Sequence, residues 1–102
     1  MKIAITSQNK HSVTGHAGKC RKFWIYQIDD GKVAYKELLE LPLEQSFHAS
    51  SPQEPHPLDD IQVFITGGMG EGLRRRLMVK QIEAVVTEET DLEKVIEQYL
   101  GN

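Results

Sequence analysis

The chain has 102 residues, of which 39% are hydrophobic and 26% charged, and its formal net charge is −3. This length and composition predict one globular domain, residues 1–102, and exclude a disordered chain. The longest apolar runs, of five or six residues, exclude a membrane-spanning helix, and the short basic start is no signal peptide. Cys20 is the only cysteine, which excludes an internal disulfide and favours a cytoplasmic location.

The charges are unevenly distributed along the chain. Residues 1–28 contain five bases and no acid, whereas residues 29–102 contain 15 acids and seven bases. This distribution predicts a positive field near the loop that follows the first strand. The alternative is that acids distant in the sequence fold back and neutralise the bases.

The first half of the chain reads as three strands. Alternating apolar residues predict a strand over Lys2–Thr6, and Ser7–Lys22 then forms a long polar loop of a kind that usually has a function. A hairpin follows, with antiparallel strands over Phe23–Ile28 and Val33–Leu41. Between them, Asp30-Gly31 supplies the positive φ of a tight turn.

The second half contains two strands and two helices. Pro42–Pro57, with four prolines and two histidines, is expected to be a loop and the most mobile part. The continuous apolar run Ile61–Ile65 predicts a strand buried on both faces and placed at the centre of the sheet. A helix over Glu71–Val79 and a strand over Gln81–Val86, parallel to the preceding strand, complete this unit.

The chain ends in a helix. Thr90 and Glu93 have the spacing of a capping box, and Gly101 stands where a helix ends. Apolar residues recur between them at helical spacing: Leu92, Val95, Ile96, Tyr99 and Leu100. Together these patterns predict a mixed five-stranded sheet with helices packed on it, an α/β domain of two or three layers.

The most informative stretch joins the fourth strand to the helix. It contains Gly67, Gly68 and Gly70, and backbone amides at the start of a helix attract anions because they lack partners there. The alternative is that the glycines only permit a tight reversal of the chain. Their spacing fits neither the dinucleotide fingerprint nor the Walker loop. The first and fourth strands also lack the carboxylates that a two-metal nuclease requires.

Few residues here can ligate a soft or borderline metal: Cys20, Met69, His11, His16, His48 and His56. One cysteine cannot build a four-thiolate cluster site, and no spacing matches structural zinc. A preassembled anionic cluster, held by one or two ligands with amides and bases, remains open. His16 is the best-placed ligand and Cys20 the second, with a place in the core as the alternative for Cys20. The three consecutive arginines 74–76 are expected to form a solvated helix face.

Two stretches carry a family resemblance. Residues 15–26, which read GHAGKCRKFWIY, and residues 66–70, which read TGGMG, resemble the dinitrogenase iron-molybdenum cofactor biosynthesis family. This NifX-like group also includes the carboxyl-terminal part of NifB. The resemblance covers nearly the whole chain, with His16 on the family's loop histidine and glycines 67, 68 and 70 on its glycine turn. Ala17 replaces the family's aromatic residue, and the stretch between the third and fourth strands is shorter than usual.

The resemblance implies a ribonuclease H-like α/β/α fold without nuclease residues. It also implies a non-enzymatic protein that binds or carries iron-molybdenum cofactor or an iron–sulfur precursor, with cofactor-assembly or nitrogenase-like proteins as partners and no nucleic-acid or membrane partner. The expected cofactor-binding residues are His16, Lys19, Arg21, Gly67, Gly68, Met69 and Gly70, and the expected metal ligands are His16 and Cys20.

Two other functions remain open from the sequence. The same amides and bases suit a binder, sensor or enzyme for a small phosphorylated or carboxylated molecule, with the turn over Gly67–Gly72 as its site. Alternatively, the Pro42–Pro57 segment is the docking site of an interaction module.

Overall fold

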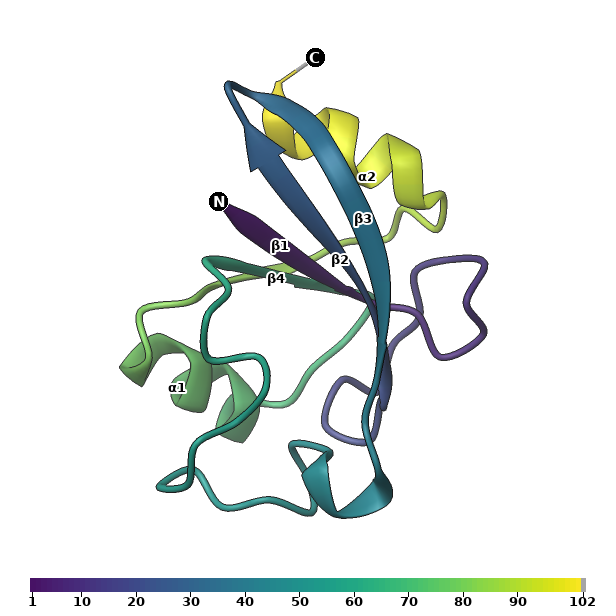
Figure 1. Cartoon of the computed structure of the whole chain (residues 1–102). Helices are drawn as coiled ribbons and strands as arrows, with labels where there is room; N and C mark the ends of the chain where they lie inside the picture. Colours follow the sequence, from purple (N-terminus) through teal and green to yellow (C-terminus); the bar gives the residue numbers. More distant parts are fainter. Residues whose placement is uncertain (102) are drawn as a thin grey trace.

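A five-stranded sheet in the order β3-β2-β1-β4-β5 organises the structure, a computed structural model that describes residues 1–101 (Figure 1). Its strands are β1 (Lys2–Thr6), β2 (Lys22–Asp29), β3 (Lys32–Glu40), β4 (Val63–Thr66) and β5 (Glu83–Val86). β2 is antiparallel to both of its neighbours, β1 and β3, and β1, β4 and β5 run parallel. The predicted mixed sheet is therefore confirmed.

The position of one strand differs from the prediction. β1, not β4, is central, because the hairpin of β2 and β3 adds two strands beyond β1 on the side away from β4. β4 is nevertheless buried on both faces, as its apolar sequence indicates. It begins at Val63 because Ile61 and Gln62 form the turn into it, where the Gln62 amide donates to the carbonyl of Lys2 at 3.0 Å.

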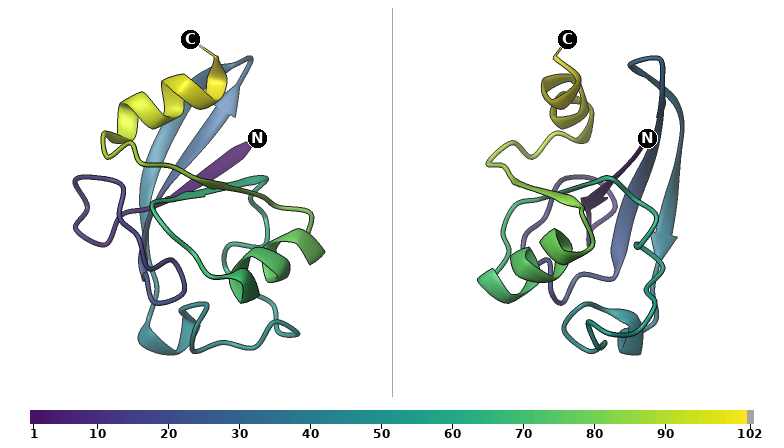
Figure 2. Two further views of the ribbon diagram at one scale, coloured as in Figure 1. Left: turned by 180° about the vertical axis from the view of Figure 1, so that it is seen from behind. Right: turned by 90° about the vertical axis from the view of Figure 1, so that its left-hand side faces the viewer.

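Each face of the sheet has its own apolar core. Helix α1 (Glu71–Val79) packs with the residues before β4 over Ala4, Phe23 and Phe64. Helix α2 (Leu92–Leu100) packs on the other face, over Ile3 and Ile5. The strands alternate between the two cores because successive side chains of a strand point to opposite faces. The result is a three-layer α/β/α arrangement, with the helices on opposite sides of the strands (Figures 1 and 2).

The terminal helix has its predicted apolar face but a different cap. Leu92, Val95 and Ile96 are buried, whereas Tyr99 is only half-buried. The cap is Asp91, whose side chain accepts from the Lys94 amide at 3.0 Å, so the predicted Thr90 capping box is wrong. Glu93 is turned to the sheet instead, where its carboxylate lies 2.9 Å from Lys36 Nζ and 3.3 Å from the Tyr26 hydroxyl. Gly101 ends the helix with a φ of 79°.

The order of the strands places three connections at one edge of the sheet. β1 and β4 are parallel neighbours, so their carboxyl ends lie side by side there. β2 runs antiparallel to β1 and therefore begins at the same edge, and β3 runs antiparallel to β2 and therefore ends there. We call this the carboxyl edge; the loop 7–21, the turn 67–70 and the proline-rich segment 42–57 all start or end on it (Figure 1).

No helix within residues 1–101 could cross a membrane. Both α-helices have nine residues, and a helix that spans a membrane requires about 20.

Candidate functional site

Two buried threonines hold the site together at the carboxyl edge. Thr6 is the last residue of β1 and Thr66 the last of β4, both are fully buried, and their hydroxyl oxygens lie 2.8 Å apart. The Thr6 hydroxyl also donates to the carbonyl of Thr14 at 2.6 Å, and Thr66 Oγ1 accepts from the Gly68 amide at 3.3 Å. One hydroxyl pair thus connects the sheet, the N-terminal loop and the glycine turn.

The N-terminal loop and the glycine turn are in direct contact. The Gly67 amide donates to the Thr14 carbonyl at 3.0 Å, and the Ala17 amide donates to the Gly68 carbonyl at 3.1 Å. A Cβ atom on Gly67 would come within 3.2 Å of the Thr14 oxygen, which is closer than most such contacts. Glycine is favoured at this position because a side chain would press on the backbone of Thr14.

An open pocket of ≈ 420 Å³ lies between these two segments. We call it the first pocket; its lining residues are Gly15, His16, Ala17, Gly18, Gly67, Gly68, Met69 and Gly70. The structure therefore brings five of the seven expected binding residues together: His16, Gly67, Gly68, Met69 and Gly70. The side chains that line it include one imidazole and one thioether, both of which are ligands of softer metals.

His16 has an unusual backbone conformation. Its φ is +52°, in the left-handed region, while its carbonyl accepts from the amides of Lys19 and Cys20 at 3.0 and 3.1 Å. This tight turn leaves the imidazole exposed at the pocket. A residue other than glycine in this region is uncommon, and such strain concentrates at functional sites.

The amides of the glycine turn divide into two groups. Those of Gly67 and Gly68 are occupied by Thr14 and by the Thr66 hydroxyl, so these two residues form the wall of the pocket. The amides of Met69 and Gly70 form no hydrogen bond with any atom of residues 1–101. Gly70 is also the N-cap of α1, where the amides of the first turn lack intrahelical partners. Of the four residues of this turn that the sequence indicates, only Met69 and Gly70 thus have amides open to an anion.

The positive field of the N-terminal region is partly neutralised. Lys2 pairs with Asp60 at 2.8 Å and Lys10 with Glu40 at 3.6 Å, which are acids distant in the sequence. Lys19 and Arg21 form no ion pair within residues 1–101 and stand in the same loop as His16, outside the lining of the first pocket. They contribute a field rather than a pocket wall.

Cys20 lies away from the pocket. It is 3% exposed, packs in the core on the α1 face, and its Sγ donates to the Lys22 carbonyl at 3.1 Å. Burial raises the pKa of its thiol, which disfavours the thiolate that binds metal. Cys20 is therefore a small core residue, which is the alternative given above. Of the two expected metal ligands, only His16 lines the first pocket among the described residues. More generally, residues 1–101 contain no group of three or more His, Cys, Asp or Glu placed to hold a metal ion.

A second pocket, of ≈ 390 Å³, adjoins the first at Gly18 and Gly70. It lies between α1 and the proline-rich segment, and its other lining residues are Phe47, His48, Ser50, Pro52, Gly72, Leu73 and Arg76. Two pockets thus follow one another from the glycine turn along the start of α1.

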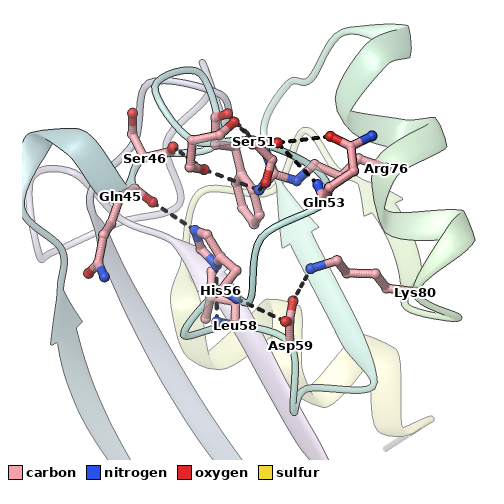
Figure 3. Close-up of polar contacts among 11 residues, drawn as sticks. Gln45, Ser46, Ser51, Gln53, His56, Leu58, Asp59, Arg76 and Lys80 are labelled. Carbon is pink, nitrogen blue, oxygen red and sulfur yellow. Dashed lines mark hydrogen bonds and ion pairs between the residues drawn. The ribbon is translucent and has the colours of Figure 1, made fainter.

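Arg76 fixes the wall of the second pocket. It was expected on a solvated helix face, but it is only 9% exposed, because the proline-rich segment covers it. Its guanidinium donates to the carbonyls of Phe47 and Ser50 and to the Ser50 hydroxyl, at 2.9 to 3.1 Å. It also donates to the Ser51 carbonyl at 3.1 Å (Figure 3). It also lies 5.0 Å from the centre of the Phe47 ring. Arg76 therefore ties the proline-rich segment, in which Leu43–Gln45 forms a single 3₁₀ turn, to α1.

His56 is a second attachment of the same segment. Its ring stacks on Phe47 with centroids 4.4 Å apart, Nε2 lies 2.7 Å from the Gln45 carbonyl, and Nδ1 accepts from the Leu58 amide at 3.1 Å (Figure 3). These contacts suit the neutral ring with its proton on Nε2, because a proton on Nδ1 would face the Leu58 N–H. Burial, followed by the nearby Arg76 cation, lowers the pKa of His56.

Sequence reasoning missed the residues that support the site. The only sequence signal for the threonine pair is that β1 and β4 both end in Ile-Thr. Arg76 has a weaker signal: it stands three residues after Leu73, a spacing that places both on one face of a helix.

Comparison with protein families gives one match over the whole chain. The model of a family described as "Dinitrogenase iron-molybdenum cofactor" matches residues 1–102. A comparison with curated proteins finds no match.

Several solved structures share the fold. The protein PH0822 superimposes with a TM-score of 0.75 at 23% identity, over 99% of this chain and 89% of that one. The protein mj0327 of Methanocaldococcus jannaschii, provisionally described as a dinitrogenase, has a TM-score of 0.72 at 22% identity, with coverages of 99% and 88%. A Thermotoga protein, TM1290, provisionally described as a NifB protein, has a TM-score of 0.69 at 16% identity, with the same coverages.

The threonine pair leads to the first prediction. Thr66→Val keeps the shape of the side chain but leaves its buried hydrogen-bond partners unpaired, so the free energy of unfolding should fall by about 1–3 kcal/mol. The amide signals of Gly67 and Gly68 should also shift in a ¹H–¹⁵N NMR spectrum. Thr90→Val, at an exposed position, is the control and should change the stability by less than about 0.5 kcal/mol. Equal effects of the two changes would contradict the role given to the pair.

A second prediction concerns Arg76. Arg76→Met should lower the free energy of unfolding by about 1–3 kcal/mol, because it removes the donors that satisfy buried carbonyl groups. Amide hydrogen exchange at residues 48–50 should become faster as the segment detaches. Arg75→Met, at the exposed neighbouring position, should do neither. Unchanged exchange in the Arg76 variant would show that the segment is held by other contacts.

The third prediction concerns pH. Since the pKa of His56 is lowered in the folded state, the unfolded chain binds a proton more readily, and the stabilising contribution is complete above about pH 6.5 and lost as the pH falls below it. Asp59, Lys80 and Arg76 surround this group. The difference in unfolding free energy between pH 7 and pH 5 should therefore be smaller in His56→Gln than in the wild type. The exposed His11→Gln should leave that difference unchanged, and a similar reduction in both variants would contradict the assignment to His56.

Proposed function

Because the chain belongs to the dinitrogenase iron-molybdenum cofactor family, we propose that it binds and carries an anionic metal cluster during cofactor assembly. The cargo is iron-molybdenum cofactor or an iron–sulfur precursor, and the partners are the proteins of the assembly pathway that deliver and receive it. The observation that carries the proposal is the first pocket, in which the exposed His16 imidazole stands beside a wall of glycines at the start of a helix.

The first pocket suits a bulky, preassembled ligand. Five of its eight lining residues are glycines, so a rigid cluster can approach the backbone without meeting side chains. The Met69 and Gly70 amides and the start of α1 favour negative charge. His16 then supplies one neutral nitrogen ligand, which replaces a solvent molecule on a metal atom of the cluster.

A site with only a few protein ligands also suits a carrier. A site that encloses a metal with three or four side chains holds it tightly, whereas a single imidazole with amides and a diffuse positive field permits release to the next protein. Lys19 and Arg21 supply that field from the same loop without entering the pocket. We therefore assign the chain a non-enzymatic role.

The role of His16 is tested by anaerobic titration with isolated iron-molybdenum cofactor. His16→Ala should weaken binding at least about tenfold, since even indirect support of a metal ligand is worth 10–100-fold. Visible absorbance and iron retained on gel filtration report the complex.

Two matched variants make this test specific. His11→Ala removes an exposed histidine of the same loop that does not line the pocket and should bind as the wild type does. Cys20→Ala should also retain binding, because the thiol is buried in the core. If Cys20→Ala loses the cofactor while His16→Ala keeps it, the thiolate is the anchor and the assignment of His16 is wrong.

The charge of the loop gives a further prediction. Lys19→Gln combined with Arg21→Gln should weaken cofactor binding and reduce its dependence on salt, because both cations act through a field that salt screens. The stability of the domain should change little, since exposed charges contribute little to it. Lys32→Gln with Lys94→Gln, outside this loop, is the control for net charge. Binding that is independent of salt would show that the field is incidental; competition by phosphate or citrate at low concentration would instead favour a small anion as the natural ligand.

A further inference from the structure

We propose that His48 is a second imidazole ligand of the cargo, so that a multinuclear cluster spans both pockets and is held from two sides. This inference rests on the proposed function and adds to it the class of cargo, a cluster with at least two accessible metal atoms rather than a single ion. His48 belongs to the proline-rich segment, far in sequence from the loop that carries His16.

Backbone contacts place His48 beside the first pocket. Its amide donates to the Gly18 carbonyl at 2.7 Å, and a Cβ atom on Gly18 would lie 3.9 Å from the Cβ of His48. His16 is two residues before Gly18, and Gly18 lines both pockets. Both exposed histidines therefore lie near Gly18, His16 in the lining of the first pocket and His48 in that of the second.

The second pocket suits negative charge. In the described part of the chain, neither pocket has Asp or Glu in its lining, although the chain has a net charge of −3. The second pocket contains the buried guanidinium of Arg76, whose partners are carbonyl and hydroxyl oxygens and not carboxylates. Asp59, the carboxylate whose charge acts on Arg76, is itself paired with Lys80 and lines neither pocket, so the guanidinium favours an anionic ligand beside it.

The chemistry of the two histidines is the same. A neutral imidazole donates a nitrogen lone pair to a metal atom, displaces a solvent ligand and needs no electron transfer. A cluster presents several metal atoms on its surface, so imidazoles in adjoining pockets can each bind a different one. Such a ligand would occupy both pockets, which share Gly18 and Gly70 and which we together call the trough.

The segment that carries His48 is fixed at both sides of this residue. Arg76 holds the Phe47 carbonyl on one side and Ser50 on the other. The ring of His48 remains exposed while its backbone is held, which is the arrangement that a preorganised ligand requires.

Histidine footprinting tests the inference. The protein is treated with diethyl pyrocarbonate, alone and with isolated iron-molybdenum cofactor under anaerobic conditions, and the modification of each histidine is measured by mass spectrometry. The exposed His11 should react in both states, and the buried His56 should react slowly in both. Cofactor should protect His16 and His48 together. Protection of His16 alone would overturn the inference and leave the proposed function standing, and protection of neither would count against both.

Variants separate ligation from simple covering. His48→Ala should weaken cofactor binding about tenfold or more, and the double variant with His16→Ala should bind more weakly than either single variant. With 15N-labelled histidine, the nitrogen hyperfine couplings of the bound cofactor in pulsed EPR should indicate two imidazoles in the wild type and one in His48→Ala. Wild-type affinity and unchanged couplings in His48→Ala would refute ligation by His48, whatever the footprint.

Discussion

The structure of the site depends on a hydrogen bond between two buried hydroxyl groups. Thr6 and Thr66 end neighbouring parallel strands, and their oxygens lie 2.8 Å apart at the carboxyl edge. Through Thr14 and Gly68 the same pair fixes the N-terminal loop against the glycine turn. Buried hydroxyls have no water to bond to, so their partners are strongly specified. This is how loops that consist largely of polar residues and glycine keep one pocket shape without a packed core of their own.

A second constraint comes from Arg76, which holds the proline-rich segment at residues 47–51, after its one 3₁₀ turn over Leu43–Gln45. Four prolines prevent a continuous helix there, and the segment instead satisfies its carbonyl groups with one guanidinium and packs Phe47 and His56 against the sheet. The segment therefore forms a defined wall of the second pocket. Its attachment also depends on a neutral His56, because both ring nitrogens are engaged in that form only. Protonation of His56 therefore weakens the attachment of this wall.

Much of the fold was predictable from the sequence, and much of the support of the site was not. Strand alternation and helical spacing predict the helices and strands because burial of one face leaves a periodic pattern in the local sequence. The hairpin turn and the βαβ order predict two of the four strand pairs, β2 with β3 and β4 with β5. The place of β1 at the centre was not predictable, since it depends on which edge the β2–β3 hairpin joins. The cap of α2 at Asp91 lies one residue from the predicted Thr90 because Glu93 is drawn to Lys36 and Tyr26 across the sheet. His16 and the glycine turn were recognisable as a motif, whereas Thr6, Thr66 and Arg76 act through contacts between residues far apart in sequence. Cys20 was ambiguous from sequence, and only its burial decides its place.

In this account the cargo enters where three connections of the chain meet, and the rest of the domain serves to hold them in place. The most direct test is a ¹H–¹⁵N NMR titration of the labelled protein with isolated iron-molybdenum cofactor under anaerobic conditions, because a bound paramagnetic cluster broadens nearby amide signals. Broadening should begin at residues 15–18 and 67–72, extend to residues 47–50, and leave α2 and the turn between β2 and β3 unaffected. Saturable broadening centred on α2 or on that turn, with sharp signals from residues 15–18 and 67–72, would contradict the proposed site.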